Sequence, residues 1–295
     1  MVIRYLGNVS VAALMAMCGV FGGCHAAIAS ESHSAHAVAD SVIAEQRAAL
    51  AKATAGAGYG PQSPRDISSV AGNNHRSFGS APDRAAMNLC NIHFHENAEH
   101  RGGEFTTYAG NGDGHGYGSG FKYDGTLTDA ELAPVSDKIG ASEHGDLVPG
   151  DTIEIHFVHS TAQVTPGATL GSCISEAIKN PQLRVETVVA VLVNDTKAAN
   201  FAQMAKITQV DGMYQAANIP DNLGQPVTYA GSTTGPSYNE KGSPFQVTWN
   251  VRPKVVKLDI NSVGTWLKDN PFKEDHAHGV RNLVMNPDLL SPIGQ

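Results

Sequence analysis

The chain has 295 residues, of which 41 % are hydrophobic and only 16 % are charged. This balance predicts one or two globular domains with a sizeable core, and it excludes an intrinsically disordered chain. There are 20 Lys and Arg residues against 28 Asp and Glu residues, so the formal net charge is −8. Binding to a nucleic-acid backbone needs clustered Lys and Arg, and so we expect no nucleic acid among the partners.

The N-terminus has the pattern of a secretory signal peptide. A lone Arg4 precedes an apolar stretch from Val9 to Phe21, and small residues follow up to Ala29. This pattern predicts a signal peptide over residues 1–29, which would make the mature protein periplasmic or secreted. The apolar stretch is too short for a comfortable membrane span, and no later stretch is long and apolar enough for one. A lipid anchor at Cys24 is the alternative interpretation.

Residues 30–60 are predicted to form an N-terminal helical or flexible segment, and residues 61–295 a single domain. Residues 41–55 are rich in Ala, Leu, Glu and Lys, with apolar residues at helical spacing. This composition predicts a helix outside the main fold, and such a helix could pair two copies of the chain in a homodimer. Residues 56–84 are rich in Gly, Ser, Asn and Pro, which indicates irregular structure.

From Asn88 onward, short β-rich runs are separated by turns, and we expect strands at 91–95, 104–108, 152–158, 184–193, 245–251 and 254–260. The run from Val185 to Val193 is almost entirely Val, Ala and Leu, which predicts a central strand buried on both faces. Residues 110–120 contain six glycines and form a loop; they lack the flanking strand and helix of a phosphate-binding motif. The predicted fold class is therefore α+β and mostly β, around a large twisted sheet.

Four cysteines occur in the chain, and two of them, Cys18 and Cys24, would leave with the signal peptide. The remaining pair, Cys90 and Cys173, would meet an oxidising compartment, which predicts a disulfide between them. Metal ligation is the competing interpretation of this pair. Their wide separation and the lack of a C-x-x-C partner favour the disulfide.

Three histidines in two strand-like runs stand out in the middle of the sequence. The first run contains His93 and His95, and the second contains Glu154 and His156. Side chains two residues apart share a face of a strand, so each pair points the same way. If the two strands pair, three imidazoles converge with a carboxylate beside the third. Three neutral nitrogens with a fourth position open to water are typical of a catalytic zinc site rather than a structural one.

The residues around these histidines and a later segment form four blocks. They are His93 to His100 (HFHENAEH), Glu154 to His159 (EIHFVH), Thr228 to Pro236 (TYAGSTTGP) and Val247 to Trp249 (VTW). In this order the blocks resemble the carbonic anhydrases. The α class has H-x-H, S-E-H, E-L-H-L-V-H and Y-x-G-S-x-T-T-P before V-T-W. The closer resemblance is to the δ class, which has N-[VI]-H-x-H, A-E-H, G-D-x-x-E-[VI]-H and a V-x-x-V-N-D strand, compared here with Val188 to Asp195.

The resemblance implies a large, twisted, mixed central sheet of the α-carbonic-anhydrase type with few short helices. It also implies that the three histidines bind a zinc ion and that Glu154 orients one of the ligand rings. Glu99 becomes a buried carboxylate that accepts a hydrogen bond from a threonine hydroxyl. A gapless comparison makes this threonine Thr234, and Thr233 is the other possibility, because the loop reads T-T-G-P where the α class has L-T-T-P.

The implied activity is the reversible hydration of carbon dioxide to bicarbonate and a proton by zinc-bound hydroxide. Carbonic anhydrase is the reference case for bound zinc that lowers the pKa of water to about 7. An apolar wall beside the metal would receive carbon dioxide, and Val158 and Leu170 are candidates. An exposed imidazole with a pKa near 6.5 can carry the released proton. The candidates for this relay are His75, His115 and His144.

Two other functions compete with this interpretation. A cupin-type enzyme would use His93, His95 and Glu99 as ligands, often for iron or manganese. A non-catalytic domain of the same fold would bind zinc or an anion without turnover. A second H-x-H, at His276 and His278, lies in a polar stretch that we interpret as a solvated loop. His100 and His159 are expected to stabilise the structure rather than to bind metal.

Overall fold

The computed structural model describes residues 37–233 and 239–294. Three sequence predictions fall outside the described residues. They are the signal peptide over residues 1–29, the lipid anchor at Cys24 and the placement of Thr234.

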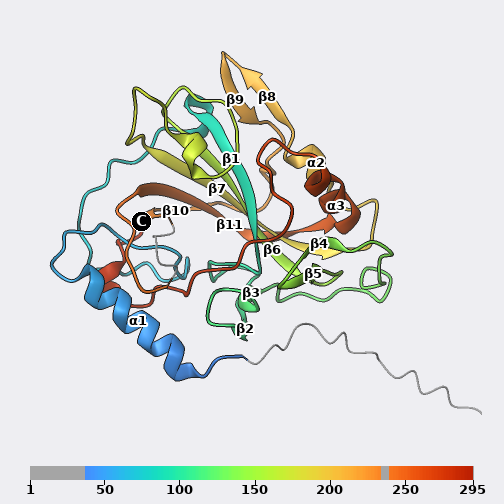
Figure 1. The fold of residues 1–295 in the computed structure, drawn as a ribbon, viewed down its shortest axis with the longest axis horizontal. Helices are drawn as coiled ribbons and strands as arrows, with labels where there is room; N and C mark the ends of the chain where they lie inside the picture. Colours follow the sequence, from blue (N-terminus) through green and yellow to red (C-terminus); the bar gives the residue numbers. More distant parts are fainter. Residues whose placement is uncertain (1–36, 234–238, 295) are drawn as a thin grey trace, which may run out of the picture. The chain divides into compact units, whose positions relative to one another are not determined.

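A five-stranded mixed sheet forms the centre of the described chain, in the order β1-β6-β7-β11-β10 (Figure 1). Its strands are β1 (Asn88–Glu96), β6 (Thr152–Ser160), β7 (Leu183–Val193), β11 (Gln246–Asp259) and β10 (Val227–Ser232). β7 and β11 are parallel, whereas the other neighbouring strands are antiparallel. Strands predominate and the helices are few and short, so the predicted fold class is confirmed.

The buried Val-rich run is the middle strand of this sheet, β7, as its composition predicts. Two other predictions need correction. The runs 245–251 and 254–260 are one strand, β11, whose register shifts between Val251 and Val255 around Pro253. The run at 104–108 is a strand only from Thr107, where β2 (Thr107–Asn111) begins.

The two faces of the sheet are covered differently. Ile92, Phe94 and Phe157 belong to a large apolar cluster on one face, together with residues of α2 (Phe201–Met204) and α3 (Ile260–Lys268). The opposite face carries the second cluster, which includes Val158 and Trp249. Because side chains alternate along each strand, His93, His95 and His156 share this second face.

Two-stranded hairpins and single turns complete the domain. β2 pairs with β3 (Ser119–Lys122), β4 (Ile139–Ser142) with β5 (Gly145–Leu147), and β8 (Ile207–Val210) with β9 (Met213–Ala216). The 3-10 turns are η1 (Arg84–Ala86), η2 (Leu170–Cys173) and η3 (Pro287–Leu289).

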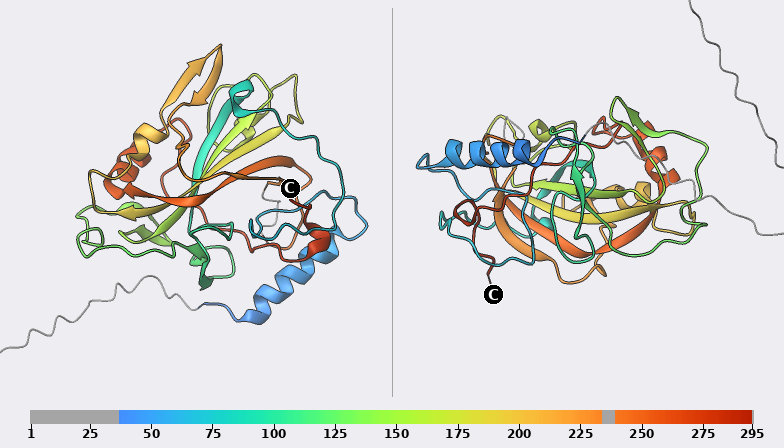
Figure 2. Two further views of the ribbon diagram at one scale, coloured as in Figure 1. Left: turned by 180° about the vertical axis from the view of Figure 1, so that it is seen from behind. Right: turned by 90° about the horizontal axis from the view of Figure 1, so that it is seen from below.

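The predicted N-terminal helix is present as α1 (Asp40–Thr54). It lies at the end of the sheet opposite α3 (Figure 2). Leu50 packs with Val284, Leu289 and Leu290 near the C-terminus, so one side of α1 is buried against the domain. Among the described residues, no helix is both long and apolar enough to cross a bilayer.

The predicted disulfide between Cys90 and Cys173 is present. It joins β1 to η2, and both cysteines are buried.

Candidate metal centre

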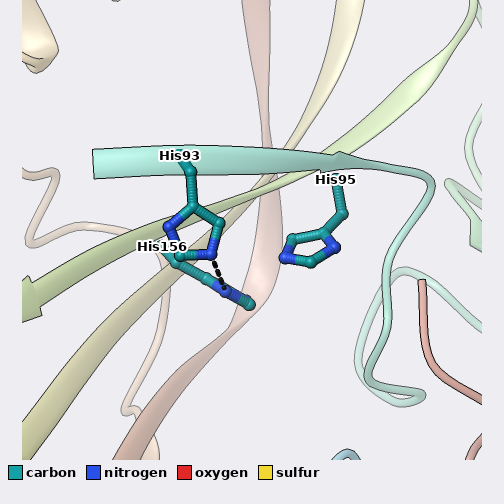
Figure 3. A group of neighbouring side chains, drawn as sticks. All are labelled: His93, His95 and His156. Carbon is teal, nitrogen blue, oxygen red and sulfur yellow. Dashed lines mark hydrogen bonds between the residues drawn. The ribbon is translucent and has the colours of Figure 1, made fainter. Parts of the chain in front are cut away.

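The pairing of β1 with β6 brings the three predicted histidines together. His93 lies directly opposite His156 in the register, and His95 lies opposite Glu154. The three rings point toward one another from the two strands (Figure 3). His95 and His156 are buried, and His93 is half-buried. The sheet therefore builds the cluster from a strand pair, as the two-residue spacing predicts.

The rings of His93 and His95 each have one nitrogen held by an oxygen outside the cluster. Nδ1 of His93 lies 2.6 Å from Oδ1 of Asn91, and Nδ1 of His95 lies 2.9 Å from the carbonyl oxygen of Gly279. Both oxygens can only accept a hydrogen bond, so each Nδ1 carries the hydrogen. The Nε2 of both rings then keeps its lone pair for a metal ion.

Glu154 holds the third ring in the opposite tautomer. Its Oε1 accepts from Nε2 of His156 at 2.7 Å and from Nδ1 of His100 at 2.7 Å, and its Oε2 accepts from the backbone N–H of His100 at 3.1 Å. Nε2 of His100 lies 2.6 Å from the hydroxyl of Tyr229, which lies 2.9 Å from Oγ of Ser63. This fully bonded chain leaves the lone pair of His156 on Nδ1.

The three free nitrogens fit a zinc ion. They all lie within 4.8 Å of one another, and Nδ1 of His156 is 3.3 Å from Nε2 of His93. A tetrahedral site with Zn–N bonds of about 2.0–2.1 Å places its ligand nitrogens about 3.3–3.4 Å apart. Three imidazoles also leave a fourth position for a small molecule. The donor set is thus compatible with an open zinc site.

Burial keeps the rings of His93 and His95 neutral. It lowers the pKa of His93 well below its ordinary value, and the rings of His156, His95 and His278 lower it further. Burial also lowers the pKa of His95 to about 4, although Glu99 opposes the shift. Rings with such values are unprotonated at pH 7, which is the state that a metal requires.

Glu154 is ionised in this buried setting. Burial raises the pKa of Glu154, but the electrostatic interaction with the His100 ring and the hydrogen bonds from His100 and His156 outweigh this effect and hold the pKa well below its usual range. A carboxylate that accepts from a ligand imidazole makes the ring a stronger metal donor. His100, which the sequence analysis assigned only a structural role, is the residue that fixes this carboxylate.

A family model described as delta carbonic anhydrase matches residues 84–262, which is more than half of the chain and includes all three histidines. The chain belongs to the delta carbonic anhydrase family. The resemblance seen in the sequence blocks is therefore confirmed. No curated protein matches this chain with a significant score.

Several solved carbonic anhydrases are similar to this chain. The α-carbonic anhydrase of Thermovibrio ammonificans, in complex with the inhibitor sulfanilamide, is 17 % identical, with 75 % of this chain and 82 % of the other covered and a TM-score of 0.25. The α-carbonic anhydrase of Photobacterium profundum is 14 % identical, with 76 % and 84 % covered and a TM-score of 0.26. A hyperthermostable carbonic anhydrase from an active hydrothermal vent chimney is 16 % identical, with 77 % and 84 % covered and a TM-score of 0.26.

Glu99 of this delta carbonic anhydrase is buried beside the triad. Its Oε1 accepts from the backbone N–H of Arg281 at 2.9 Å and lies 3.6 Å from Nδ1 of His95. Its Oε2 lies 4.0 Å from Nε2 of His156. Glu99 thus approaches the nitrogens that face away from the centre of the triad, which is not where a ligand stands. This position and the family match make the cupin alternative wrong.

Arg281 connects Glu99 to the threonine segment. Besides its backbone contact with Glu99, it donates from Nη1 to the carbonyl oxygen of Thr233 at 3.1 Å. Oγ1 of Thr233, which is buried, lies 3.0 Å from Oγ of Ser243. Arg281 is not recognisable in the sequence, because a backbone N–H donor has no signature there.

An apolar wall stands next to the triad on the same face of the sheet. Val158 follows His156 by two residues in β6, and it pairs with Val185 of β7. Val185 pairs in turn with Trp249 of β11, whose ring centroid lies 5.1 Å from that of His156. Val158 belongs to this apolar cluster, and Leu170 packs against it from η2, while their role as the wall that receives carbon dioxide stays a prediction.

The three proton-relay candidates do not contact the triad among the described residues. His75 and His115 are exposed. His144 stacks on Tyr117 with 3.5 Å between ring centroids. Their role therefore stays a prediction.

The assignment of His278 to a solvated loop was wrong, because this residue contacts β1. Its ring stacks on His93 with 5.4 Å between centroids, and its Nε2 lies 2.7 Å from Oε2 of Glu274. Its backbone N–H donates to the carbonyl oxygen of Phe94, and its carbonyl oxygen accepts from Glu96. The segment around His278 therefore lines the free edge of β1, where Gly279 reaches His95.

A second close set of donors consists of His100, Glu154 and His156. Both contacts of Glu154 with these rings are hydrogen bonds of 2.7 Å. Because this set already satisfies its own donors and acceptors, it supports the first cluster rather than forming a separate metal site.

Proposed function

We propose that this protein catalyses the zinc-dependent, reversible hydration of carbon dioxide to bicarbonate and a proton. The observation that carries the proposal is the convergence of three unprotonated ring nitrogens, each fixed by an acceptor on the opposite nitrogen of its ring. Membership of the delta carbonic anhydrase family supports it independently. Residues 61–295 would form the catalytic domain.

In this proposal His93, His95 and His156 hold zinc through Nε2, Nε2 and Nδ1 in that order. Zinc in carbonic anhydrases is the reference case of an ion that turns water into a nucleophile at neutral pH. Asn91, the carbonyl group of Gly279 and Glu154 would keep the three rings in the required tautomers. The three imidazole nitrogens would thus select zinc by donor type and geometry rather than by charge.

Glu99 and a threonine hydroxyl would orient the attacking oxygen. A hydroxyl that donates to Glu99 can only accept from a group on its other side, which fixes the direction of that group's lone pair. Thr234 is the proposed residue and Thr233 the alternative. The bridge from Glu99 through Arg281 to Thr233 supports a threonine segment anchored beside this carboxylate.

Carbon dioxide would rest against the apolar wall formed by Val158, Val185 and Trp249. The molecule is small and apolar, so it needs no polar contact in its waiting position. Nε1 of Trp249 is the one side-chain donor of this wall, and it already donates to the carbonyl oxygen of Ser232. The wall would therefore bind bicarbonate poorly, which favours release of the charged product.

We further propose that the protein works outside the cytoplasm, in the periplasm or as a secreted protein. The buried disulfide between Cys90 and Cys173 supports an oxidising compartment. The signal peptide, the anchor at Cys24 and homodimer formation remain predictions from the sequence.

A stopped-flow assay of carbon dioxide hydration with a pH indicator tests the proposal. The purified protein should contain about one zinc per chain and be active, and it should lose activity on chelation and regain it with zinc. His95→Ala should lose both metal and activity. His276→Ala is the matched control, because His276 is partly exposed and bonded to Asp275, and it should keep both.

The threonine assignment is tested in the same assay. Thr234→Ala should keep zinc and lose most of the hydration rate, whereas Thr233→Ala should keep both zinc and the rate. The reverse result would assign the role to Thr233. Stoichiometric zinc in a wild-type protein without activity would support the non-catalytic binding domain instead.

A further inference from the structure

The strand that carries two of the three proposed ligands contains a β-bulge at Cys90. Leu89 lies opposite His159 in β6, and Asn91 lies opposite Val158, so Cys90 is an extra residue without a partner of its own. Beyond the bulge the register places His93 opposite His156. A bulge of this kind re-aims every side chain that follows it.

This extra residue decides which face the histidines take. Continuing the register of Leu89 without a bulge would place His93 opposite Ile155, which belongs to the apolar core on the other face of the sheet. A one-residue slip moves all following side chains to the opposite face. The triad therefore exists only while the bulge at Cys90 is maintained.

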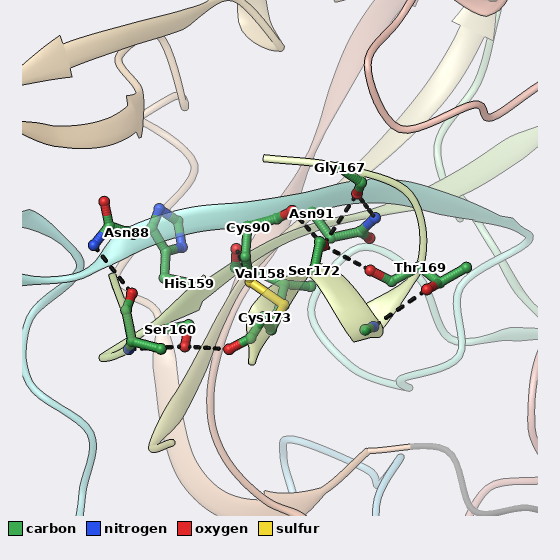
Figure 4. The surroundings of a disulfide bond; sticks show 12 residues. Asn88, Cys90, Asn91, Val158, His159, Ser160, Gly167, Thr169, Ser172 and Cys173 are labelled. Atoms are coloured by element: carbon green, nitrogen blue, oxygen red, sulfur yellow. Dashed lines mark hydrogen bonds between the residues drawn. A yellow bond between two sulfur atoms is a disulfide. The ribbon is translucent and has the colours of Figure 1, made fainter. Parts of the chain in front are cut away.

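The segment from Gly167 to Cys173 holds this bulge in place (Figure 4). The carbonyl oxygen of Cys90 accepts from the N–H of Gly167 at 3.0 Å and from Oγ of Ser172 at 2.7 Å. The disulfide ties the side chain of Cys90 to Cys173 at the end of the same segment. The carbonyl oxygen of Cys90, which the bulge removes from the strand ladder, is thus hydrogen-bonded by the segment Gly167–Cys173, and the disulfide ties that segment to the bulge.

The same segment reaches a metal ligand through Asn91. Nδ2 of Asn91 donates to the carbonyl oxygen of Gly167 at 3.0 Å, and this contact turns Oδ1 toward Nδ1 of His93 at 2.6 Å. Without Gly167 the amide could flip and present a donor to His93. A flipped amide would favour the tautomer with the hydrogen on Nε2, which cannot bind a metal.

We propose that the disulfide-closed segment Gly167–Cys173 is a positioning device for the metal centre, which sets the metal affinity by fixing the bulge at Cys90 and the tautomer of His93. Asn91 is a positioning residue in this device. The inference rests on the zinc centre of the proposed function, but it concerns the state of His93 before any metal binds.

Asn88 provides a matched control on the same strand. It is buried like Asn91, and its Nδ2 also donates to a backbone carbonyl of a neighbouring segment, that of Ala162 at 3.2 Å. It precedes the bulge and does not contact a ligand ring. Asn88→Ala and Asn91→Ala therefore delete the same group, one outside and one inside the proposed device.

The experiment measures zinc affinity by competition with a chromophoric chelator for wild type, Asn88→Ala, Asn91→Ala, the double variant Cys90→Ser/Cys173→Ser, and the triple variant that adds Asn91→Ala. Asn91→Ala and the double variant should each bind zinc about 10- to 100-fold more weakly than wild type, and Asn88→Ala should match wild type. The triple variant should lose less than the product of the two separate losses, because both act through one path.

Nitrogen-15 NMR of the metal-free proteins reads the tautomer directly. Wild type and Asn88→Ala should carry the hydrogen of His93 on Nδ1, and Asn91→Ala should not hold it there exclusively. Because Asn91→Ala keeps the disulfide, it tests the device even where the double variant does not fold. Equal zinc affinities and tautomers for Asn88→Ala and Asn91→Ala would overturn the inference. Failure of wild type to bind zinc would instead overturn the proposed function, and the tautomer comparison would still decide this inference.

Discussion

Oε1 of Glu154 lies 2.7 Å from Nε2 of His156, and this contact decides which nitrogen of His156 faces the other two histidines. The same oxygen accepts from His100, so the carboxylate receives hydrogen bonds from two rings at once. Only an anion with no hydrogen of its own can accept at all of these positions. Glu154 therefore sets the tautomer of His156 in the same way as Asn91 sets that of His93.

Glu154→Gln should weaken zinc binding about 10- to 100-fold. The amide nitrogen that replaces one carboxylate oxygen donates rather than accepts, so it faces either the two donating rings at Oε1 or the donating backbone N–H of His100 at Oε2, and Glu154 can no longer accept all three hydrogen bonds. Zinc affinity is measured by competition with a chelator. Glu186→Gln is the control, because Glu186 is a buried carboxylate that lies opposite Phe157 on the other face of the sheet. Unchanged zinc affinity in Glu154→Gln would contradict the assigned role.

Tyr229→Phe should destabilise the metal-free protein by about 1–3 kcal/mol, because it leaves a buried acceptor without a donor. Nδ1 of His100 donates to Glu154, so Nε2 of His100 must accept from the hydroxyl of Tyr229. Burial raises the pKa of Tyr229 well above its usual value, which keeps this hydroxyl protonated. The free energy of unfolding in urea measures the loss.

Ser63→Ala is the comparison for Tyr229→Phe. It removes a neighbour of the same hydroxyl but leaves the bond from Tyr229 to His100 intact. Its cost should be smaller, about 0.5–1.5 kcal/mol. A larger loss in Ser63→Ala than in Tyr229→Phe would show that His100 does not depend on this donor.

The stability of the metal-free protein should fall as the pH drops from about 6.5 to 4. Burial lowers the pKa of His159 to about 4. Between the two values the unfolded chain binds a proton at this position and the folded chain does not. The stability that the lowered pKa of His159 makes dependent on pH is therefore fully present above pH 6.5 and is lost as the pH falls. The slope of the free energy of unfolding is at most about 1.4 kcal/mol per pH unit for one group.

His159→Asn should reduce the slope of the free energy of unfolding against pH by at most the amount expected for one proton. The asparagine amide can still donate to the carbonyl oxygen of Phe157, which lies 3.0 Å from Nδ1 of His159, but it does not titrate. Urea unfolding at several pH values between 4.5 and 7 gives the slopes. His93 and His95 also have lowered pKa values, so some slope should remain. Identical slopes for the variant and wild type would be inconsistent with this origin.

The sequence was sufficient for the parts of the site that depend on local periodicity. A two-residue spacing places His93 with His95 and Glu154 with His156, and it needs only that the two strands pair. The Val-rich run predicts β7 because a strand covered on both faces must be apolar throughout. The cysteine pair was assigned from compartment and chemistry alone, and the disulfide is present.

The remaining parts depend on contacts between distant segments. Gly279 holds His95 through a backbone oxygen, and any residue type has one, so no pattern marks it. Arg281 reaches Glu99 with its backbone N–H for the same reason. His278 was assigned to a solvated loop because the residues around it in the sequence are polar. Nothing in the sequence indicates that this segment lies along the edge of β1. The bulge at Cys90 is likewise visible only once the register on both of its sides is known.

An anomalous-difference map at the zinc edge, from crystals of the zinc-loaded protein, shows whether the three nitrogens bind one zinc ion. We expect a single strong peak bonded to Nε2 of His93, Nε2 of His95 and Nδ1 of His156, at about 2.0–2.1 Å from each. A peak bonded to His100, Glu154 and Nε2 of His156, or no peak at the triad, would contradict it.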